Sequence, residues 1–330
     1  MRLFVTTLLA AATLSAAAPP APAAELIATL PSVTPLRVYG STVAWSQWDP
    51  STRGYRFWLH RAGRSEPLPI SPRPNPGDFD LGTDARGVPM LVYTRCNPRC
   101  DLYASGYGGA ERRLDAASSP DADESAPTLS RGRLAWARGV SAFTRRLGDA
   151  ASVASRRVLG VTSRSCPVGG RCAVTGDRTI EDLELQGDQL AATTFFTEPR
   201  GPGEGRSVVS LVSLRGARAR VRTVAEVTQG RKGQSFVGVG FAAQRLGFAL
   251  ACFGAPRGCA YGAHRFRISR SELERSRQAR GVQGYAPTGA GAAEAYVLLA
   301  AHPERDSDAA CPCRIERRAV SGFGRAPRPR

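Results

Sequence analysis

Hydrophobic and polar residues repeat along this chain in a unit of two strands joined by a short turn. A short apolar strand comes first, a turn with a glycine or a polar tip follows, and a strongly apolar strand comes last. Copies of the unit occupy residues 34–45, 79–93, 126–136, 181–193, 236–248 and 286–297. They recur about every 50 residues, which is the span of a four-stranded blade in a β-propeller.

The segments between the copies supply further strands. Residues 55–60 alternate polar and apolar side chains, as a half-buried strand does, and residues 100–104 and 207–214 are also strand-like. The pattern predicts an all-β, six-bladed propeller of four-stranded antiparallel blades over residues 25–330, as one domain. A double β-sandwich with the same number of strands is the alternative. A helix is expected only at Ser271 to Arg280, where Ser271 and Glu274 form a candidate capping box.

The first 24 residues have the pattern of a secretory signal peptide. Arg2 is followed by an apolar run over residues 3–18, and then by prolines and small residues that favour cleavage after Ala23 or Ala24. A membrane anchor is less favoured, because the run is short and ends in prolines. We expect an extracytoplasmic protein, either secreted, periplasmic or associated with the cell wall, with no membrane segment after cleavage.

Eight cysteines fall into close pairs along the chain. The pairs are Cys96 and Cys100, Cys166 and Cys172, Cys252 and Cys259, and Cys311 and Cys313. An even number in an exported chain predicts local disulfides. The repeats place the first and third pairs in equivalent hairpins, as clips at the blade tips. A disulfide that closes a C-x-C ring is strained. Three states are therefore considered for Cys311 and Cys313: a structural disulfide, a redox pair or reduced thiols.

No metal site is expected. The cysteines contain no C-x-x-C pair, and His60, His264 and His302 do not have the spacing of paired zinc ligands. Residues 121–125 offer oxygens at alternate positions, as a calcium loop does. Ala126 stands where an EF-hand needs glycine, so a polar turn between blades is preferred to a calcium site.

The chain carries a formal net charge of +17, and its basic residues are nearly all arginine, since Lys232 is the only lysine. A spread of arginines over a solvated surface explains this excess. The functional alternative is attraction to an anionic polymer of the cell envelope. No basic run alternates with aromatic residues, so nucleic acid is not an expected partner.

No catalytic constellation or cofactor motif is recognisable. The chain has no G-x-S-x-G elbow and no P-loop, and Gly238-Val-Gly240 lacks the third glycine of a dinucleotide site. Trp48 and Tyr55 flank a polar turn and are the candidate ligand contacts. Trp45 is expected in the core, because Tyr93 and Trp136 hold the equivalent repeat positions.

The repeat form is clearest in residues 38–45 (VYGSTVAW) and 129–136 (LSRGRLAW). With the export signal, it resembles the exported TolB-like and WD-repeat-like six-bladed propellers of bacteria. The resemblance implies a non-catalytic binding or scaffold module for a protein or a cell-envelope ligand. The alternative is a propeller hydrolase or lyase acting on polysaccharide or peptide. Acids, an arginine and a histidine converging at the channel would favour the enzyme, whereas small and apolar side chains there would not.

Overall fold

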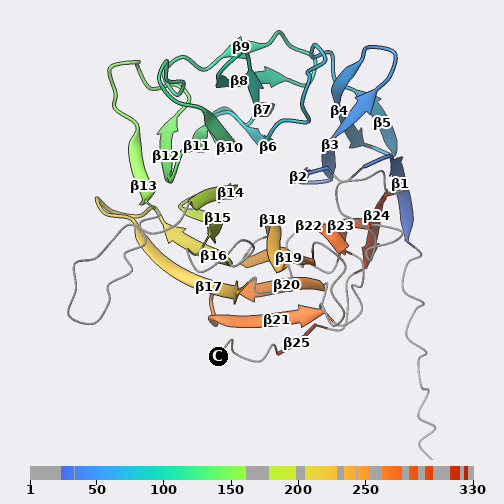
Figure 1. The fold of residues 1–330 in the computed structure, drawn as a ribbon, viewed down its shortest axis with the longest axis vertical. Helices are drawn as coiled ribbons and strands as arrows, with labels where there is room; N and C mark the ends of the chain where they lie inside the picture. Colours follow the sequence, from blue (N-terminus) through green and yellow to red (C-terminus); the bar gives the residue numbers. More distant parts are fainter. Residues whose placement is uncertain are drawn as a thin grey trace, which may run out of the picture.

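A computed structural model describes residues 24–32, 34–160, 178–197, 205–228, 234–242, 244–252, 262–276, 282–288, 294–299, 313–319 and 323–325. Every regular element in these ranges is a β-strand, and the strands form six antiparallel sheets. The sheets stand around a common centre (Figure 1). The first and last sheets touch, so the ring is closed. The predicted six-bladed propeller is confirmed, and this closure excludes the double sandwich.

Each blade is numbered in chain order, and its strands run outward from the channel. The first strands are β2 (Leu36–Tyr39), β6 (Phe79–Thr83), β10 (Glu124–Ser130), β14 (Arg178–Gln186), β18 (Gln234–Ala242) and β22 (Val282–Thr288). The second strands are β3 (Thr42–Asp49), β7 (Pro89–Cys96), β11 (Arg133–Arg138), β15 (Gln189–Thr197), β19 (Arg245–Cys252) and β23 (Glu294–Leu299). Each of the six repeat copies is therefore one inner hairpin.

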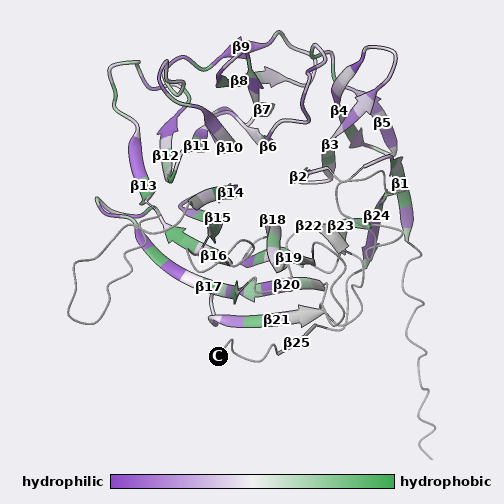
Figure 2. Ribbon diagram, in the orientation of Figure 1, coloured by the Kyte–Doolittle hydropathy of each residue, from purple (hydrophilic) through white to green (hydrophobic). Residues whose placement is uncertain are grey.

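The outer strands complete the blades. The third strands are β4 (Gly54–Arg61), β8 (Cys100–Gly106), β12 (Ser141–Arg146), β16 (Gly205–Ser213), β20 (Gly262–Arg267) and β24 (Cys313–Ala319). The fourth strands are β5 (Arg64–Pro67), β9 (Arg112–Arg113), β13 (Arg156–Gly160), β17 (Arg220–Thr228), β21 (Glu272–Ser276) and β1 (Glu25–Leu30). Polar and apolar residues alternate along β17, whereas β13 begins with two arginines and continues with apolar residues (Figure 2).

The two ends of the chain both join blades at their outer edges. Strand β1 pairs with β24, so the N-terminal strand supplies the fourth strand of blade 6. Strand β25 (Phe323–Arg325) pairs with β21 and adds a fifth strand to blade 5. Because β1 comes before blade 1 in sequence but pairs within blade 6, it closes the ring by hydrogen bonds as well as by packing.

The hydrophobic core lies between neighbouring blades. Successive residues of a strand face opposite sides of its sheet, and both sides of each blade are covered. In β3, Ala44 therefore packs against blade 2, whereas Val43 and Trp45 pack against blade 6. This two-sided burial explains why the second strands read as continuous apolar runs. The expectation that Trp45 is a core residue is confirmed, since the side chain is buried.

The predicted helix at 271–280 is wrong for the part that the structure describes. Residues 272–276 form β21, which pairs with β20, and residues 277–280 lie outside the described residues. Glutamate, leucine and arginine have high helix propensities. In blade 5 these residues instead form a strand that pairs with β20. Glu274 is buried between Arg265 and Arg267, with which it forms ion pairs of 2.6 Å and 2.8 Å. In the described ranges, no helix is long and apolar enough to cross a membrane.

The two ends of the ring differ in their connections. The first strand of each blade begins at one end of the ring. That end also holds the hairpins between second and third strands, at residues 49–54 and 96–100, and we call it the hairpin end. The opposite end holds the tight turns between first and second strands, such as those of residues 39–42 and 130–133.

Candidate functional site

Polar side chains of the inner strands gather at the channel. The first and second strands of each blade are paired residue by residue from the turn that joins them. The third pair from the turn contains Arg37 in blade 1, Thr128 in blade 3, Glu184 in blade 4 and Gly240 in blade 5. Asp80 of blade 2 reaches the same level, because its carboxylate accepts a hydrogen bond of 2.8 Å from the Thr128 hydroxyl. Four consecutive blades thus contribute polar side chains to one layer of the channel, and Gly240 of blade 5 lies at the same level.

These side chains form hydrogen bonds with unpaired peptide groups at the edges of neighbouring inner strands. The edge of an inner strand that faces the channel has no strand partner, so its peptide groups need other partners. Asp80 accepts from the N–H of Leu129 in blade 3 at 2.8 Å. Thr128 in turn accepts from the N–H of Leu185 in blade 4 at 2.9 Å. Each polar side chain thereby fastens its own blade to the next one.

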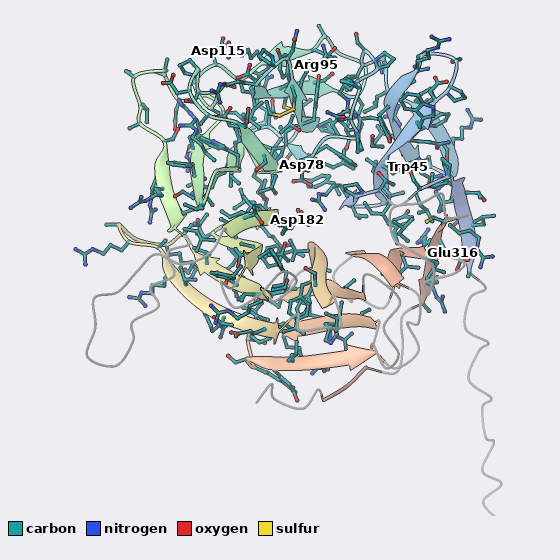
Figure 3. The ribbon with its side chains drawn as sticks, viewed as in Figure 1. Trp45, Asp78, Arg95, Asp115, Asp182 and Glu316 are labelled. Atoms are coloured by element: carbon teal, nitrogen blue, oxygen red, sulfur yellow. A yellow bond between two sulfur atoms is a disulfide. The ribbon has the colours of Figure 1, made fainter. Side chains whose placement is uncertain are left out.

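One ion pair crosses the channel. The guanidinium of Arg37 in blade 1 binds the carboxylate of Asp182 in blade 4, and both side chains are buried. Arg37 also donates to the carbonyl of Phe79 in blade 2 at 2.9 Å, and Asp182 accepts from the N–H of Val239 in blade 5 at 3.0 Å. In Figure 3, Asp182 lies on the side of its blade that faces the centre of the ring.

The electrostatics of the layer follow from burial and from this pair. Burial opposes the charge of Arg37, yet the carboxylates of Asp182 and Asp80 raise its pKa above the usual value. Burial raises the pKa of Asp80 to about 6, although Arg37 and the hydrogen bonds from Leu129 and Thr128 oppose the rise. Burial and the charge of Asp80 together raise the pKa of Glu184 well above its usual value. Arg37 therefore compensates these acids only in part.

A hollow opens from the channel beside Glu184. Its lining comes from blades 1, 4 and 5, and its free space is about 210 Å³, open solvent included. The lining residues are Leu36, Arg37, Val38, Glu184, Val239, Gly240 and Phe241. Across the described ranges, no group of three histidine, cysteine or carboxylate side chains stands together as a metal site.

The calcium-like segment has protein partners instead. Asp123 accepts a hydrogen bond of 2.9 Å from the N–H of Cys100, which fixes the base of a neighbouring hairpin. Glu124 is buried and forms an ion pair of 2.8 Å with Arg138. These contacts give the segment a structural role between blades.

The predicted ligand contacts lie together at the hairpin end of blade 1. Trp48 is 39% exposed, and its ring meets that of half-buried Tyr55 edge to face, with centroids 5.2 Å apart. Asp49 orders the turn beyond them, since its carboxylate accepts from the N–H and the hydroxyl of Ser51. The turn is exposed as expected, while ligand contact by Trp48 and Tyr55 stays a prediction.

The described histidines lie away from the channel. His60 belongs to β4 and His264 to β20, which are third strands of their blades. The Nδ1 atom of His60 lies 3.0 Å from the Ser65 hydroxyl, and the ring of His264 stacks on Phe248 with centroids 5.4 Å apart. His302 lies outside the described residues. The channel therefore brings together acids and an arginine, without either of the described histidines.

The disulfide prediction is confirmed for one pair. Cys96 ends β7, Cys100 begins β8, and their sulfurs are bonded across the hairpin. Cys252 ends β19, as Cys96 ends β7 in the equivalent hairpin, and Cys313 begins β24. Cys313 is buried and disulfide-bonded. Cys166, Cys172, Cys259 and Cys311, with the side chain of Cys252, lie outside what the structure describes, so their pairing stays a prediction.

Sequence reasoning missed the channel layer. The repeat copies contain all of its residues, but the repeat pattern alone does not show that these side chains meet in the channel: Arg37, Asp80, Thr128, Asp182 and Glu184. The available signal is a polar or charged residue in the middle of an otherwise apolar inner strand, since such a residue needs a buried partner.

The fold places the chain among the six-bladed β-propellers. No model of a protein family matches it, and no curated protein matches it. Among solved structures, TolB from Acinetobacter baumannii is 11% identical with a TM-score of 0.45, over 86% of this chain and 64% of TolB. TolB structures are thus among the solved structures that share the fold.

Two other matches have different descriptions. Puromycin hydrolase is 15% identical with a TM-score of 0.47, over 82% of this chain and 50% of that chain. SapL1 lectin, solved with alpha methyl fucoside, is 12% identical with a TM-score of 0.45, over 91% of this chain and 97% of the lectin. The chain thus spans less than two thirds of the TolB and hydrolase chains. These similarities describe the fold and carry no argument about function.

Proposed function

We propose that the protein is an exported, non-catalytic binding module for a protein or an anionic polymer of the cell envelope. The observation that carries the proposal is the use of the channel acids. Asp80 and Asp182 bind peptide groups of the next blade, and Asp182 also holds Arg37. Acids that fasten the ring are not free to bind a reacting group. The ligand is therefore expected at the rim rather than in the channel.

Export supports the choice of partner. Cleavage of the proposed signal after Ala23 or Ala24 leaves β1 whole, because β1 starts at Glu25. The Cys96–Cys100 disulfide fits an oxidising compartment. The net charge of +17 favours an anionic polymer when the ligand is not a protein.

The proposed contact is the aromatic pair of blade 1. A large exposed ring held by a second ring is a rigid anchor of the kind that dominates binding surfaces. Tyr39 provides a matched control, since it is also 39% exposed and lies at the opposite end of the same blade.

The test is co-sedimentation of the purified protein with isolated bacterial cell envelopes. We expect Trp48→Ala to weaken binding by at least about tenfold, while Tyr39→Ala binds as the unmodified protein does. Protease treatment of the envelopes separates a protein ligand from a polymer. Equal binding by both variants, or no binding by the unmodified protein, contradicts the proposal.

A second candidate is a hydrolase or lyase acting on polysaccharide or peptide. The observation that favours it is Glu184, because a carboxyl group with a raised pKa is suited to act as a general acid. The enzyme would release soluble products from envelope material. If Glu184→Gln abolishes this release, and Glu181→Gln at an exposed position of the same strand retains it, the enzyme replaces the binding module as the proposed function.

A further inference from the structure

We propose that the end of the ring opposite the hairpin end binds an anionic lipid surface through blades 3 and 4. The contact is made by arginines and exposed valines of residues 131–133, 145–157 and 215–221, which we call the arginine patch. This inference goes beyond the proposed function, because the aromatic contact of blade 1 lies at the other end of the ring.

The strand order brings the three segments of the patch to one end. Residues 131–133 lie at the turn between the first and second strands of blade 3, and residues 147–155 connect its third and fourth strands. Residues 214–219 connect the third and fourth strands of blade 4. Antiparallel strands reverse direction at each connection, so connections of these two kinds fall at the same end of a blade.

Hydrogen bonds join the segments across the boundary between the two blades. Within blade 3, the N–H of Leu147 donates to the carbonyl of Gly132 at 2.8 Å. Between the blades, the guanidinium of Arg156 donates to the carbonyl of Leu214 at 3.2 Å. The three segments therefore form one continuous surface.

The patch carries a large excess of positive charge. It holds nine arginines and one aspartate, Asp149. Asp188 lies beside it and is shared, since Arg133 binds its carboxylate at 2.8 Å and Arg215 at 3.6 Å. Within the described ranges, four exposed arginines of the patch form no ion pair: Arg146, Arg157, Arg218 and Arg220.

Blades 1 and 2 are different at this end. Their corresponding segments are residues 39–42, 61–66, 83–88 and 106–112, which together hold four arginines and three acids. Arg61 pairs with Glu66 there, and Arg86 pairs with Asp84. These segments are nearly neutral, so the excess of the arginine patch is not a general property of this end.

Val153 stands exposed within the patch. Its side chain is 46% exposed, in the loop that connects the third and fourth strands of blade 3. The buried guanidinium of Arg145 fixes this loop by donating to the carbonyls of Asp149 and Ala150. The N–H of Val153 also donates to the Ala150 carbonyl at 2.9 Å, so the apolar side chain is held at the surface.

Val221 is the second exposed valine. Its side chain is 52% exposed at the start of β17, between Arg220 and Arg222. The Arg222 guanidinium lies over the ring of Phe266 in blade 5, 4.9 Å from its centre. Successive residues of a strand face opposite sides, so Val221 faces blade 3 and the rest of the patch.

This mixture of charged and apolar side chains suits a lipid surface better than a soluble anionic polymer. Arginine binds phosphate groups through two parallel hydrogen bonds, and each arginine near an anionic bilayer adds to the attraction. An exposed valine gains free energy on entering the boundary between headgroups and acyl chains, whereas a soluble polymer offers no apolar phase. In this orientation, Trp48 lies at the end of the ring away from the lipid.

The experiment is co-sedimentation of the purified protein with lipid vesicles. The protein should bind phosphatidylcholine vesicles that contain about 40% phosphatidylglycerol at least about tenfold more tightly than vesicles of phosphatidylcholine alone. Sodium chloride at about 0.5 M should weaken this binding at least about tenfold. The vesicles hold no protein and no cell-wall polymer, so the result does not depend on the contact at blade 1. Equal binding to both kinds of vesicle, or binding to neither, overturns the proposal.

Two double variants test whether the charge acts locally. Arg218→Gln with Arg220→Gln removes two unpaired charges from the patch and should weaken binding to the anionic vesicles at least about tenfold. Arg53→Gln with Arg99→Gln removes the same charge from exposed hairpins at the other end and should bind within about twofold of the unmodified protein. All four positions are exposed, and unchanged thermal unfolding confirms the fold. Equal losses in the two variants would mean that net charge alone acts, and would overturn the patch.

A valine variant separates a lipid surface from a soluble polyanion. Val153→Ser should weaken binding to the anionic vesicles at least about threefold, because less apolar surface enters the lipid. Val140→Ser is the matched control, since Val140 is 43% exposed at the hairpin end, and it should bind normally. Full binding by Val153→Ser, with loss in the arginine variant, would assign the patch to a soluble polyanion and overturn the lipid proposal.

Discussion

Arg37 of blade 1 pairs through the channel with Asp182 of blade 4, the blade on the opposite side of the ring. Each partner also binds the blade that follows its own, Arg37 through the Phe79 carbonyl and Asp182 through the Val239 N–H. One buried pair therefore ties together blades 1, 2, 4 and 5. Most contacts between blades join neighbours in the ring, so this pair adds a connection that packing between adjacent blades does not supply.

The contact between blades 2 and 3 depends on a glycine. A Cβ atom on Gly82 would lie 2.1 Å from the carbonyl oxygen of Leu129, so the inner strands would have to separate. We expect Gly82→Ala to lower the free energy of unfolding by at least about 2 kcal/mol. Urea unfolding followed by tryptophan fluorescence measures the change.

Gly108 is the matched control, since a Cβ atom there meets nothing within 4 Å. Gly108→Ala should change the free energy of unfolding by less than about 0.5 kcal/mol. Equal effects of the two substitutions would show that blades 2 and 3 are not packed as described.

The architecture could be predicted from the sequence because each blade repeats the same apolar hairpin. The equivalent position of blades 1, 2 and 3 holds Trp45, Tyr93 and Trp136, and all three side chains are buried. A large aromatic residue therefore recurs there although the residues around it vary. The helix at 271–280 was wrong because the pairing of β21 with β20 outweighs helix propensity. The site was harder to predict, since Arg37 and Asp182 are far apart in sequence and meet only through closure of the ring.

Asp80 should make stability depend on pH. Burial raises the pKa of Asp80 from 3.8 to about 6 in the folded protein, so folding favours its protonated form. Its contribution is complete below about pH 4 and is lost as the pH rises through about 6. Between these pH values, the Asp80 carboxyl should lower the free energy of unfolding of the unmodified protein by up to about 3 kcal/mol. The Asp80→Asn variant should not show this decrease.

Urea unfolding at a series of pH values compares Asp80→Asn with the unmodified protein. The stability of the unmodified protein should fall relative to the variant as the pH rises from about 4 to about 7. Parallel profiles would contradict a raised pKa at Asp80.

The Cys96–Cys100 disulfide should contribute modestly to stability. The bonded cysteines are only four residues apart, so the bond removes little conformational freedom from the unfolded chain. We expect replacement of both by serine to cost about 2 kcal/mol or less. Urea unfolding measures the cost, and peptide mapping without reductant tests the bond itself. Free thiols at Cys96 and Cys100 in the native protein would contradict the blade-tip clip.

Arg37 and Asp182 brace the ring across its channel. A double-mutant cycle of Arg37→Met and Asp182→Asn tests it most directly, by urea unfolding near pH 7. Each single change should cost about 3–5 kcal/mol, because it leaves a buried group unpaired, and the double variant should cost much less than the sum. Additive costs, with no coupling between the two positions, would contradict the account.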